Sequence, residues 1–334
     1  ISIMDILNNQ YITYDNIIGL VNVDIEIQKR YEVNYGDILF QRSSETIEDI
    51  GRANVYLDNK PAIFGGFVIR GKKIGNYYPE FFKYLLSSPT ARKKVIVKGA
   101  GSQHYNIGQE GLSSILLHFP PLQEQNKIAQ FLCLLDHRIA TQNKIIEKYE
   151  SLIKGIRYYI LEESTHYNYL GNLCNIIKGQ QVNLDNLLKH GKYYVMNGGT
   201  QPSGYYNSYN TDAGTISISE GGNSCGYVQY NKENFWSGGH CYTLQNIKSE
   251  LTEKYLYHYL KSNEKMIMAL RVGSGLPNIQ KKDLMSLRIP IPTKENQKKI
   301  SCLLDSIEDK ISVETNVLKY AIKQKSYLLR QMFI

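Results

Sequence analysis

Two short loops carry side chains that can form hydrogen bonds with the edges of nucleic-acid bases. Both loops have the pattern Gly-Ser-x-x-x-Asn-Ile, at residues 101–107 and 273–279. Asn and Gln can pair bidentately with adenine, Arg and Lys can pair with guanine, and Tyr can stack on an exposed base. Since both loops share their Asn, that position fits a structural turn, and we expect specificity from the neighbours that differ. The candidates in and beside the loops are Gln103, His104 and Tyr105, and Ser274, Asn278, Gln280 and Lys281.

A basic stretch precedes each loop. Residues 70–98 contain eight Lys or Arg and one acidic residue, and residues 261–282 contain five and one. A single basic run is usually a solvated face, but two runs at equivalent places favour contact with phosphates. The basic candidates are Lys72, Lys73, Lys94, Lys98, Arg271 and Lys282. A second candidate set comprises Gln41, Arg42 and Ser43, with the matching Glu220 and Asn223.

These features recur because the chain repeats itself. A shift of 172 residues aligns 101–139 with 273–311 without a gap. We therefore predict two diverged copies of one module. Each copy has an α+β part, at 1–122 and 164–293, followed by a long helix, at 123–163 and 294–334. The second copy opens with residues 170–179, and nothing before Ile1 supplies an equivalent. We expect either a trimmed first copy or a sequence that starts inside a longer chain, and the lack of an initiator Met favours the latter.

Both predicted helices have apolar residues at alternating spacings of four and three, which is typical of a coiled-coil seam. A polar residue interrupts each seam at the same step, and such a residue commonly fixes register and partner choice. About 39 helical residues give a rod of roughly 58 Å, which is long enough to act as a spacer. The predicted seam residues are Ile128, Leu132, Leu135, Ile139, Gln142 and Ile146, and Ile300, Leu304, Ile307, Ile311, Glu314 and Leu318.

Composition places the chain among soluble globular proteins. Its 334 residues fit two domains, and 42% hydrophobic with 21% charged residues excludes a disordered chain. The net charge of +8 permits a polyanionic partner, although a low-GC genome also enriches Lys. No apolar run is long enough to span a membrane, and the five Cys form no C-x-x-C pair. We expect a soluble, intracellular protein without disulfides or a metal site.

Catalytic motifs are absent from the sequence. Residues 66–73 resemble a Walker A loop, but Lys73 stands where a magnesium-binding Ser or Thr is needed. Residues 119–122 resemble the Asn/Asp-Pro-Pro-aromatic motif of amino-methyltransferases, but Phe119 cannot accept a hydrogen bond from the target amine. We therefore predict a chain that is not an enzyme, with no catalytic residue and no cofactor of its own.

The helix-head pattern Pro120-x-x-x-Glu124-Gln125-x-x-Ile128-x-x-x-Leu132-x-x-x-Asp136-x-x-Ile139 recurs after the second variable part. Duplicated at this spacing, it resembles the specificity subunit of type I restriction-modification systems. The second copy departs from the pattern, with Asn296 for the Glu and Glu308 for the Asp.

This resemblance implies two target recognition domains, each reading one half of a bipartite site in double-stranded DNA. It also implies that the antiparallel helices set the gap and dock two modification subunits. Those subunits would bring S-adenosylmethionine and methylate adenine, and a restriction subunit using ATP and Mg²⁺ can join. The alternative is a coiled-coil interaction scaffold whose globular ends bind protein. A stand-alone methyltransferase is disfavoured by the missing motifs.

Overall fold

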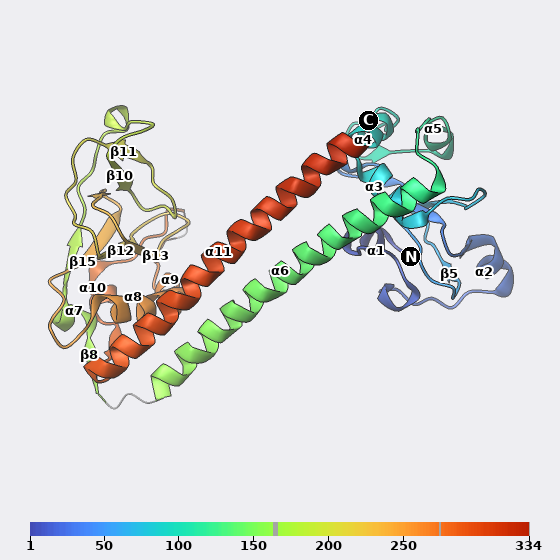
Figure 1. Cartoon of the computed structure of the whole chain (residues 1–334). Helices are drawn as coiled ribbons and strands as arrows, with labels where there is room; N and C mark the ends of the chain where they lie inside the picture. Colours follow the sequence, from blue (N-terminus) through green and yellow to red (C-terminus); the bar gives the residue numbers. More distant parts are fainter. Residues whose placement is uncertain (163–165, 274, 334) are drawn as a thin grey trace. The chain divides into compact units, whose positions relative to one another are not determined.

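A computed structural model describes residues 1–162, 166–273 and 275–333. The chain divides into two compact units, 1–144 with 315–334, and 145–314. Each unit contains one α+β part and portions of both long helices. These helices are α6 (Leu122–Glu162) and α11 (Lys294–Met332), and Figure 1 shows each as one uninterrupted helix.

The first unit contains a small antiparallel sheet. β2 lies in its middle, between β4 and β6, and Leu39 of β2 lies opposite Asn54 and Arg70. Two further strand pairs, β1 with β5 and β3 with β7, flank this sheet. The elements are α1 (Ile3–Asn8), α2 (Ile25–Tyr31), β1 (Glu32–Val33), β2 (Ile38–Gln41), β3 (Ser43–Ser44), β4 (Ala53–Val55), β5 (Ala62–Ile63), β6 (Val68–Gly71), α3 (Pro79–Ser87), α4 (Pro89–Ile96), β7 (Tyr105–Asn106) and α5 (Gln109–Ser113), with short 3-10 turns at Tyr14–Asn16 and Ile47–Asp49.

The second unit has a sheet of four antiparallel strands in the order β13-β12-β15-β9, and α8 packs beside β12 and β13 (Figure 1). A smaller sheet joins β10 to β11 and β14, and β8 pairs with β16. The elements are β8 (Tyr167–Tyr169), α7 (Leu170–Leu173), β9 (Asn175–Lys178), a 3-10 turn at Leu184–Asn186, β10 (Tyr193–Met196), β11 (Gly204–Tyr206), β12 (Thr215–Ser219), β13 (Val228–Asn231), β14 (Trp236–Ser237), β15 (Cys241–Gln245), α8 (Glu253–Ser262), α9 (Glu264–Ala269), α10 (Lys281–Met285) and β16 (Arg288–Pro290).

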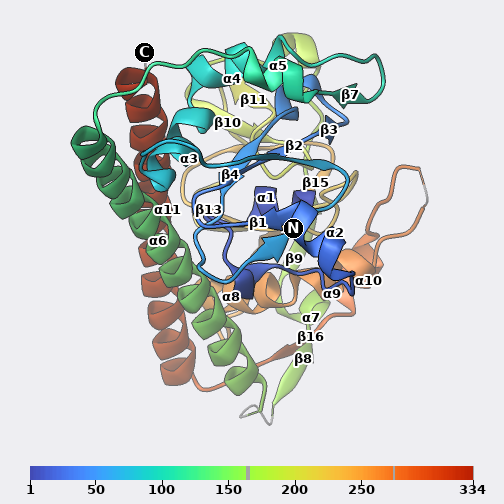
Figure 2. The same cartoon turned by 90° about the vertical axis from the view of Figure 1, so that its right-hand side faces the viewer.

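In the first unit, the head of α6 and the end of α11 share one core with α3 (Figure 2). Ile128 and Leu132 of α6 pack with Phe81 of α3 and with Phe333, which follows α11. Asp136 of α6 accepts hydrogen bonds from Tyr84 of α3, at 2.9 Å, and from the ammonium of Lys325 on α11. The start of one helix therefore lies beside the end of the other.

In the second unit, the opposite ends of the same helices share the core of the four-stranded sheet. Ile153 of α6 belongs to one buried cluster with Leu304 and Ile307 of α11. The helices are therefore antiparallel within each unit, and the predicted α+β class with two long antiparallel helices is confirmed.

The predicted seam residues face inward to different degrees. Ile128, Leu132, Leu135, Gln142, Leu304 and Ile307 are buried, whereas Ile139, Ile146, Ile300, Ile311, Glu314 and Leu318 are half-buried. Among the helices of the described residues, none combines the length and the hydropathy needed to cross a membrane.

Candidate nucleic-acid interface

The first Gly-Ser loop closes on itself through paired backbone hydrogen bonds. The N–H of Ala100 donates to the carbonyl of Asn106 at 2.9 Å, and the N–H of Asn106 donates to the carbonyl of Ala100 at 2.8 Å. Gly101 opens the loop with φ of 137°, and a Cβ there would lie 2.0 Å from the carbonyl oxygen of His104. Only glycine fits this backbone, so the loop shape is built into the sequence.

The second Gly-Ser loop closes in the same way. The N–H of Val272 donates to the carbonyl of Asn278 at 2.8 Å, and the N–H of Asn278 donates back at 3.0 Å. Gly273 has φ of 100°, as its equivalent in the first loop predicts. The shared Asn therefore occupies the same structural position in both loops.

Each loop is hydrogen-bonded to the end of the central strand of its module, β2 or β12, where the second candidate set lies. In the first module, the N–H of Ile107 donates to the carbonyl of Arg42 at 3.0 Å, and the hydroxyl of Ser43 donates to the side chain of Asn106 at 2.7 Å. In the second module, the N–H of Ile279 donates to the carbonyl of Glu220 at 2.9 Å, and Gly221 bridges Asn278. The structure therefore brings the two predicted segments of each module together.

The first module presents several of the predicted side chains at this junction. Arg42, Lys98, Gln103 and His104 are exposed, and Tyr105 is half-buried on β7. Since Arg42 follows β2 and the loop hydrogen-bonds to its backbone, cationic and polar groups lie on one surface. This combination suits simultaneous contact with phosphates and base edges.

The second module has different exposed side chains on the same backbone arrangement of loop and strand end. Its exposed candidates are Asn223, Arg271, Asn278, Gln280, Lys281 and Lys282. Ser274, also predicted, lies outside the described residues. Arg271 directly precedes the closed loop, and Lys281 and Lys282 begin the short helix α10 that follows it.

The side chain of Gln41, one of the predicted DNA-binding residues, faces inward in the structure. Gln41 is 5% exposed, and its amide nitrogen donates to the carbonyl of Ser43 at 2.8 Å. This bond stabilises the turn that follows β2. A residue at the end of a strand can face either side of the sheet, and the sequence pattern does not decide which.

Glu220 is likewise the centre of a buried polar network. Its carboxylate is bonded by Lys178 at 2.6 Å and by the hydroxyl of Tyr242 at 3.0 Å, and the imidazole of His240 lies 3.6 Å away. Burial, together with the Glu220 carboxylate, raises the pKa of Tyr242 to about 12, so Tyr242 remains a hydrogen-bond donor. Glu220 therefore links β9 to β15, and its partners Lys178 and His240 are the exposed groups.

Two predicted lysines lie away from the first Gly-Ser loop, and a third is already hydrogen-bonded to the backbone. Lys72 and Lys73 follow β6, whose last residue lies opposite Ile38 at the start of β2, whereas the loop joins the other end of β2. Antiparallel pairing thus places them at the far end of the sheet. The ammonium of Lys94 donates to the carbonyl of Leu116 at 2.8 Å.

The sequence patterns missed three side chains beside the junctions. The carbonyl of Phe67 accepts from the N–H of Arg42 at 2.9 Å, and the carbonyl of His240 accepts from the N–H of Glu220 at 2.9 Å. Both side chains are exposed. Each follows a Gly-Gly pair, at residues 65–66 and 238–239, and this repeated pair was the available signal in the sequence. Lys178, on β9, is the third.

One cluster of side chains has the composition of a metal site. His258, 1% exposed, lies with Nε2 3.0 Å from Asp305 and with Nδ1 3.5 Å from Glu308. Each ring nitrogen faces a different carboxylate, and the ammonium of Lys254 pairs with Asp305 at 3.2 Å. This arrangement fits an ion-pair network that holds α8 on the head of α11.

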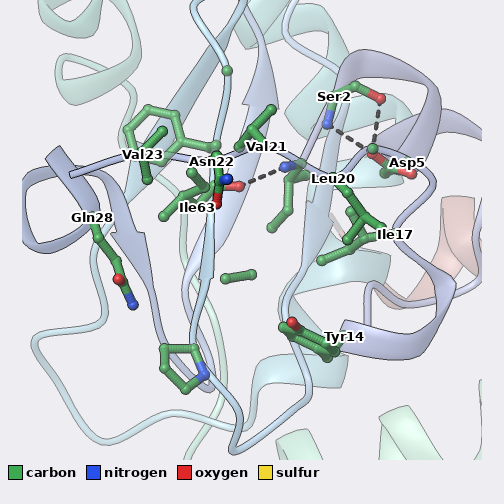
Figure 3. Close-up of a pocket in the computed structure, with 16 residues that line it drawn as sticks. Ser2, Asp5, Tyr14, Ile17, Leu20, Val21, Asn22, Val23, Gln28 and Ile63 are labelled. Carbon is green, nitrogen blue, oxygen red and sulfur yellow. Dashed lines mark hydrogen bonds between the residues drawn. The ribbon is translucent and has the colours of Figure 1, made fainter. Parts of the chain in front are cut away.

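A cavity of about 460 Å³ lies beside the first residues of the chain (Figure 3). Its wall is mainly apolar and includes Ile17, Leu20, Val21 and Ile63. Asp5 at its edge accepts hydrogen bonds from the backbone and hydroxyl of Ser2, at 2.7 and 2.8 Å, so its carboxylate is already engaged. The cavity offers no cluster of catalytic groups.

The chain thus consists of two equivalent α+β modules, each followed by a long helix, which defines a duplicated α+β protein. The family model described as type I restriction modification DNA specificity domain matches residues 3–151 and 166–324. The chain belongs to this family, which confirms the resemblance noted in the sequence.

Several relatives are similar to this chain. A putative type I specificity subunit of Mycoplasma genitalium is 36% identical over 129 residues, covering 38% of this chain and 33% of the relative. One from Mycoplasma pneumoniae is 39% identical over 123 residues, covering 36% and 32%. The matches thus span about a third of these two relatives. A putative type I restriction enzyme specificity subunit of Methanocaldococcus jannaschii is 24% identical, covering 90% and 78%.

Two solved structures share the fold. The crystal structure of a type I restriction-modification S subunit from M. genitalium aligns with a TM-score of 0.67 and 17% identity, covering 97% of this chain and 88% of that one. A chain from a study of complex assembly and conformational transition of a type I restriction-modification system aligns with a TM-score of 0.55 and 18% identity, covering 89% and 81%.

Proposed function

We propose that this chain is the non-catalytic, sequence-reading subunit of a type I restriction-modification assembly. Each module reads one half of a bipartite site in double-stranded DNA. The observation that carries the proposal is the repeated junction, where an exposed Gly-Ser loop is hydrogen-bonded to the exit of the central strand, at Arg42 in one module and at Glu220 in the other. One backbone frame thus displays two different sets of side chains.

The difference between these sets supports recognition of two different half-sites. The first junction offers Arg42, Gln103 and His104, with the aromatic Phe67 beside them. The second offers Asn223, His240 and Arg271. Arg can pair with guanine and Gln or Asn with adenine, so the two surfaces fit different bases in the major groove. Lys98 in one module, and Lys281 and Lys282 in the other, supply phosphate contacts.

The long helices suit the role of a spacer. α6 contains 41 residues, so it is about 60 Å long, whereas one turn of B-DNA advances about 34 Å. The ion pair of Asp136 with Lys325 fixes how α11 lies against α6 in the first unit. A spacer with a fixed helix register would set a constant gap between half-sites.

The outer faces of the helices would dock two modification subunits. Leu134, Tyr320 and Tyr327 are each more than 60% exposed, and large exposed apolar side chains on regular helices favour a protein partner. We propose that these partners bind S-adenosylmethionine and methylate adenine, and that a restriction subunit using ATP and Mg²⁺ joins them. This chain would then bind no cofactor itself.

Co-expression with a cognate modification subunit tests the proposal. Methylation of adenine at a single bipartite motif is expected in the host genome, and the chain alone should methylate nothing. If the complex assembles but neither binds DNA at low salt nor produces a motif, the chain is a protein-binding scaffold instead.

A further inference from the structure

The cluster of His258, Asp305 and Glu308 lies within the second unit, where α8 packs on the first half of α11. One ligand atom from each residue lies within 4.8 Å of the other two. The side chain of His258 is 1% exposed, whereas those of Asp305 and Glu308 are 35% and 32% exposed. The imidazole is therefore sealed from solvent, while both carboxylates remain partly open to it.

One nitrogen of this buried imidazole lacks a hydrogen bond. Nε2 is hydrogen-bonded to Asp305 at 3.0 Å, but Nδ1 has no hydrogen-bond partner among the described residues. Nδ1 lies on the side of Glu308, whose carboxylate oxygen is 3.5 Å away. Buried polar atoms in native proteins almost always have a partner, and a bound ion is one such partner.

The spacing of these atoms suits a zinc ion. Nδ1 of His258 and the oxygen of Glu308 are 3.5 Å apart, and two ligands of a tetrahedral zinc ion, each about 2.1 Å from it, are about 3.4 Å apart. Asp305 at Nε2 favours the tautomer with the proton on Nε2, which leaves the lone pair of Nδ1 free. Carboxylates commonly orient metal-binding imidazoles in this way.

The internal repeat shows which groups take these places in the first unit. Tyr84 of α3 is the counterpart of His258, because each follows, by the same number of residues, the N–H that binds the buried glutamine of its long helix. Asp136 is the counterpart of Glu308 under the 172-residue shift. The hydroxyl of Tyr84 donates to Asp136 at 2.9 Å. A hydroxyl meets a carboxylate in the first unit, and an imidazole meets one in the second.

The first unit supplies a positive charge at this point from its own chain. The ammonium of Lys325 on α11 is paired with Asp136. The same shift, continued along the helices, makes Ile153 of α6 the counterpart of Lys325, and Ile153 is buried in the main core with Leu304. The second unit thus has an apolar side chain at the position that provides the ammonium in the first.

The charges around the cluster leave room for a cation. Asp305 is paired with the ammonium of Lys254 at 3.2 Å. Among the described residues, the groups that contact the Glu308 carboxylate are the imidazole of His258 and the hydroxyl of Tyr257, both at 3.5 Å. Two carboxylates therefore share one ammonium, and a metal ion beside Glu308 would balance the remaining negative charge.

We propose that His258 and Glu308 form a binding site for a zinc ion that ties α8 to α11. Nδ1 of His258 and the carboxylate of Glu308 are the ligands, Asp305 orients the imidazole from Nε2, and water completes the coordination. An imidazole nitrogen beside a carboxylate suits Zn²⁺ better than Mg²⁺ or Ca²⁺, which prefer oxygen ligands alone. A zinc site departs from the sequence-based expectation of a chain without a metal, and it does not depend on the proposed role in DNA recognition.

Calorimetric titration of the chelator-treated full chain with Zn²⁺ tests the site. Glu308→Gln keeps the size of the side chain but removes its charge, and we expect it to weaken zinc binding at least tenfold. The matched control is Glu295→Gln, since Glu295 is exposed on the same helix and pairs with Lys299 at 2.7 Å. The zinc affinity of this control should stay within twofold of that of the unchanged chain.

Unfolding followed by the fluorescence of Trp236 separates this site from zinc binding elsewhere on the chain. Trp236 lies in the second unit, and an ion that binds only the folded unit raises the midpoint of its unfolding. Zinc should raise the midpoint of the unchanged chain and of Glu295→Gln, but not that of Glu308→Gln. The proposal is overturned if the unchanged chain binds no zinc, or if zinc raises the midpoint of Glu308→Gln as much as that of the unchanged chain.

Discussion

The side-chain oxygen of Gln297 lies 2.8 Å from the backbone nitrogen of Thr252, the residue that caps the start of α8. The amide nitrogen of Gln297 donates to the carbonyls of Glu250 and Pro292, both at 2.9 Å. Gln125 makes the equivalent contacts, accepting from the N–H of Tyr78 at 3.0 Å and donating to Pro120 at 2.8 Å. In each module, one buried amide joins the head of a long helix to the start of a globular helix.

Replacing Gln297 with Ala should destabilise the second unit strongly. The change leaves a buried N–H and buried carbonyls without partners, which costs about 2–3 kcal/mol in the free energy of unfolding. The single tryptophan, Trp236, lies in this unit, so its fluorescence during denaturation reports the loss. Lys298→Ala, at the next and exposed position, should change the midpoint little.

The sequence predicted the features that depend on pattern. The repeat, the two long helices and the closed Gly-Ser loops all follow from spacing, glycine positions and hydrophobic periodicity. Gln125 and Gln297 were visible as a matched pair, but their role was not, because a buried amide that bonds to distant backbone leaves no local pattern. Which side of β2 Gln41 faces, and which end of the sheet carries Lys72, depend on tertiary pairing. For that reason the sequence pattern alone could not place those two side chains.

Asp136 and Lys325 should be energetically coupled. Their side chains are 13% and 26% exposed, and Tyr84 donates to the same carboxylate. A double-mutant cycle with Asp136→Asn and Lys325→Met should give a coupling free energy of about 1–3 kcal/mol by calorimetry. The exposed pair of Glu124 and Lys127, 4.0 Å apart, should give less than about 0.5 kcal/mol in the same cycle. Equal values for the two pairs would contradict this assignment.

Stability should depend on pH through Lys83. Burial lowers the pKa of Lys83 to about 8, below the ordinary value of 10.5 for a lysine. Between these values the unfolded chain binds more protons than the folded chain, so this residue makes stability rise with pH, by at most about 1.4 kcal/mol per pH unit. Comparison with Lys83→Met isolates the effect, and the difference in unfolding free energy between the two proteins should change between pH 8 and pH 10. A constant difference would show that Lys83 titrates normally.

Arg42 and Lys72 provide a matched test of the interface. Both are exposed cations of the first module, but they lie at opposite ends of β2. Within a complex with modification subunits, Arg42→Ala should weaken binding to the cognate DNA at least tenfold and relax preference at one base pair, since a bidentate contact contributes about 1–3 kcal/mol. Lys72→Ala should stay within twofold, as fluorescence anisotropy at one fixed salt concentration can show. Equal losses would point to general charge attraction instead.

The most direct test of the central claim is replacement of residues 166–293 by the corresponding part of another family member whose motif differs. The chimera is co-expressed with the modification subunit, and the methylated motif is determined by genome-wide sequencing of adenine methylation. The account predicts that one half of the bipartite motif changes while the other half and the gap are retained. Changes in both halves, or an unchanged motif from an active complex, would contradict it.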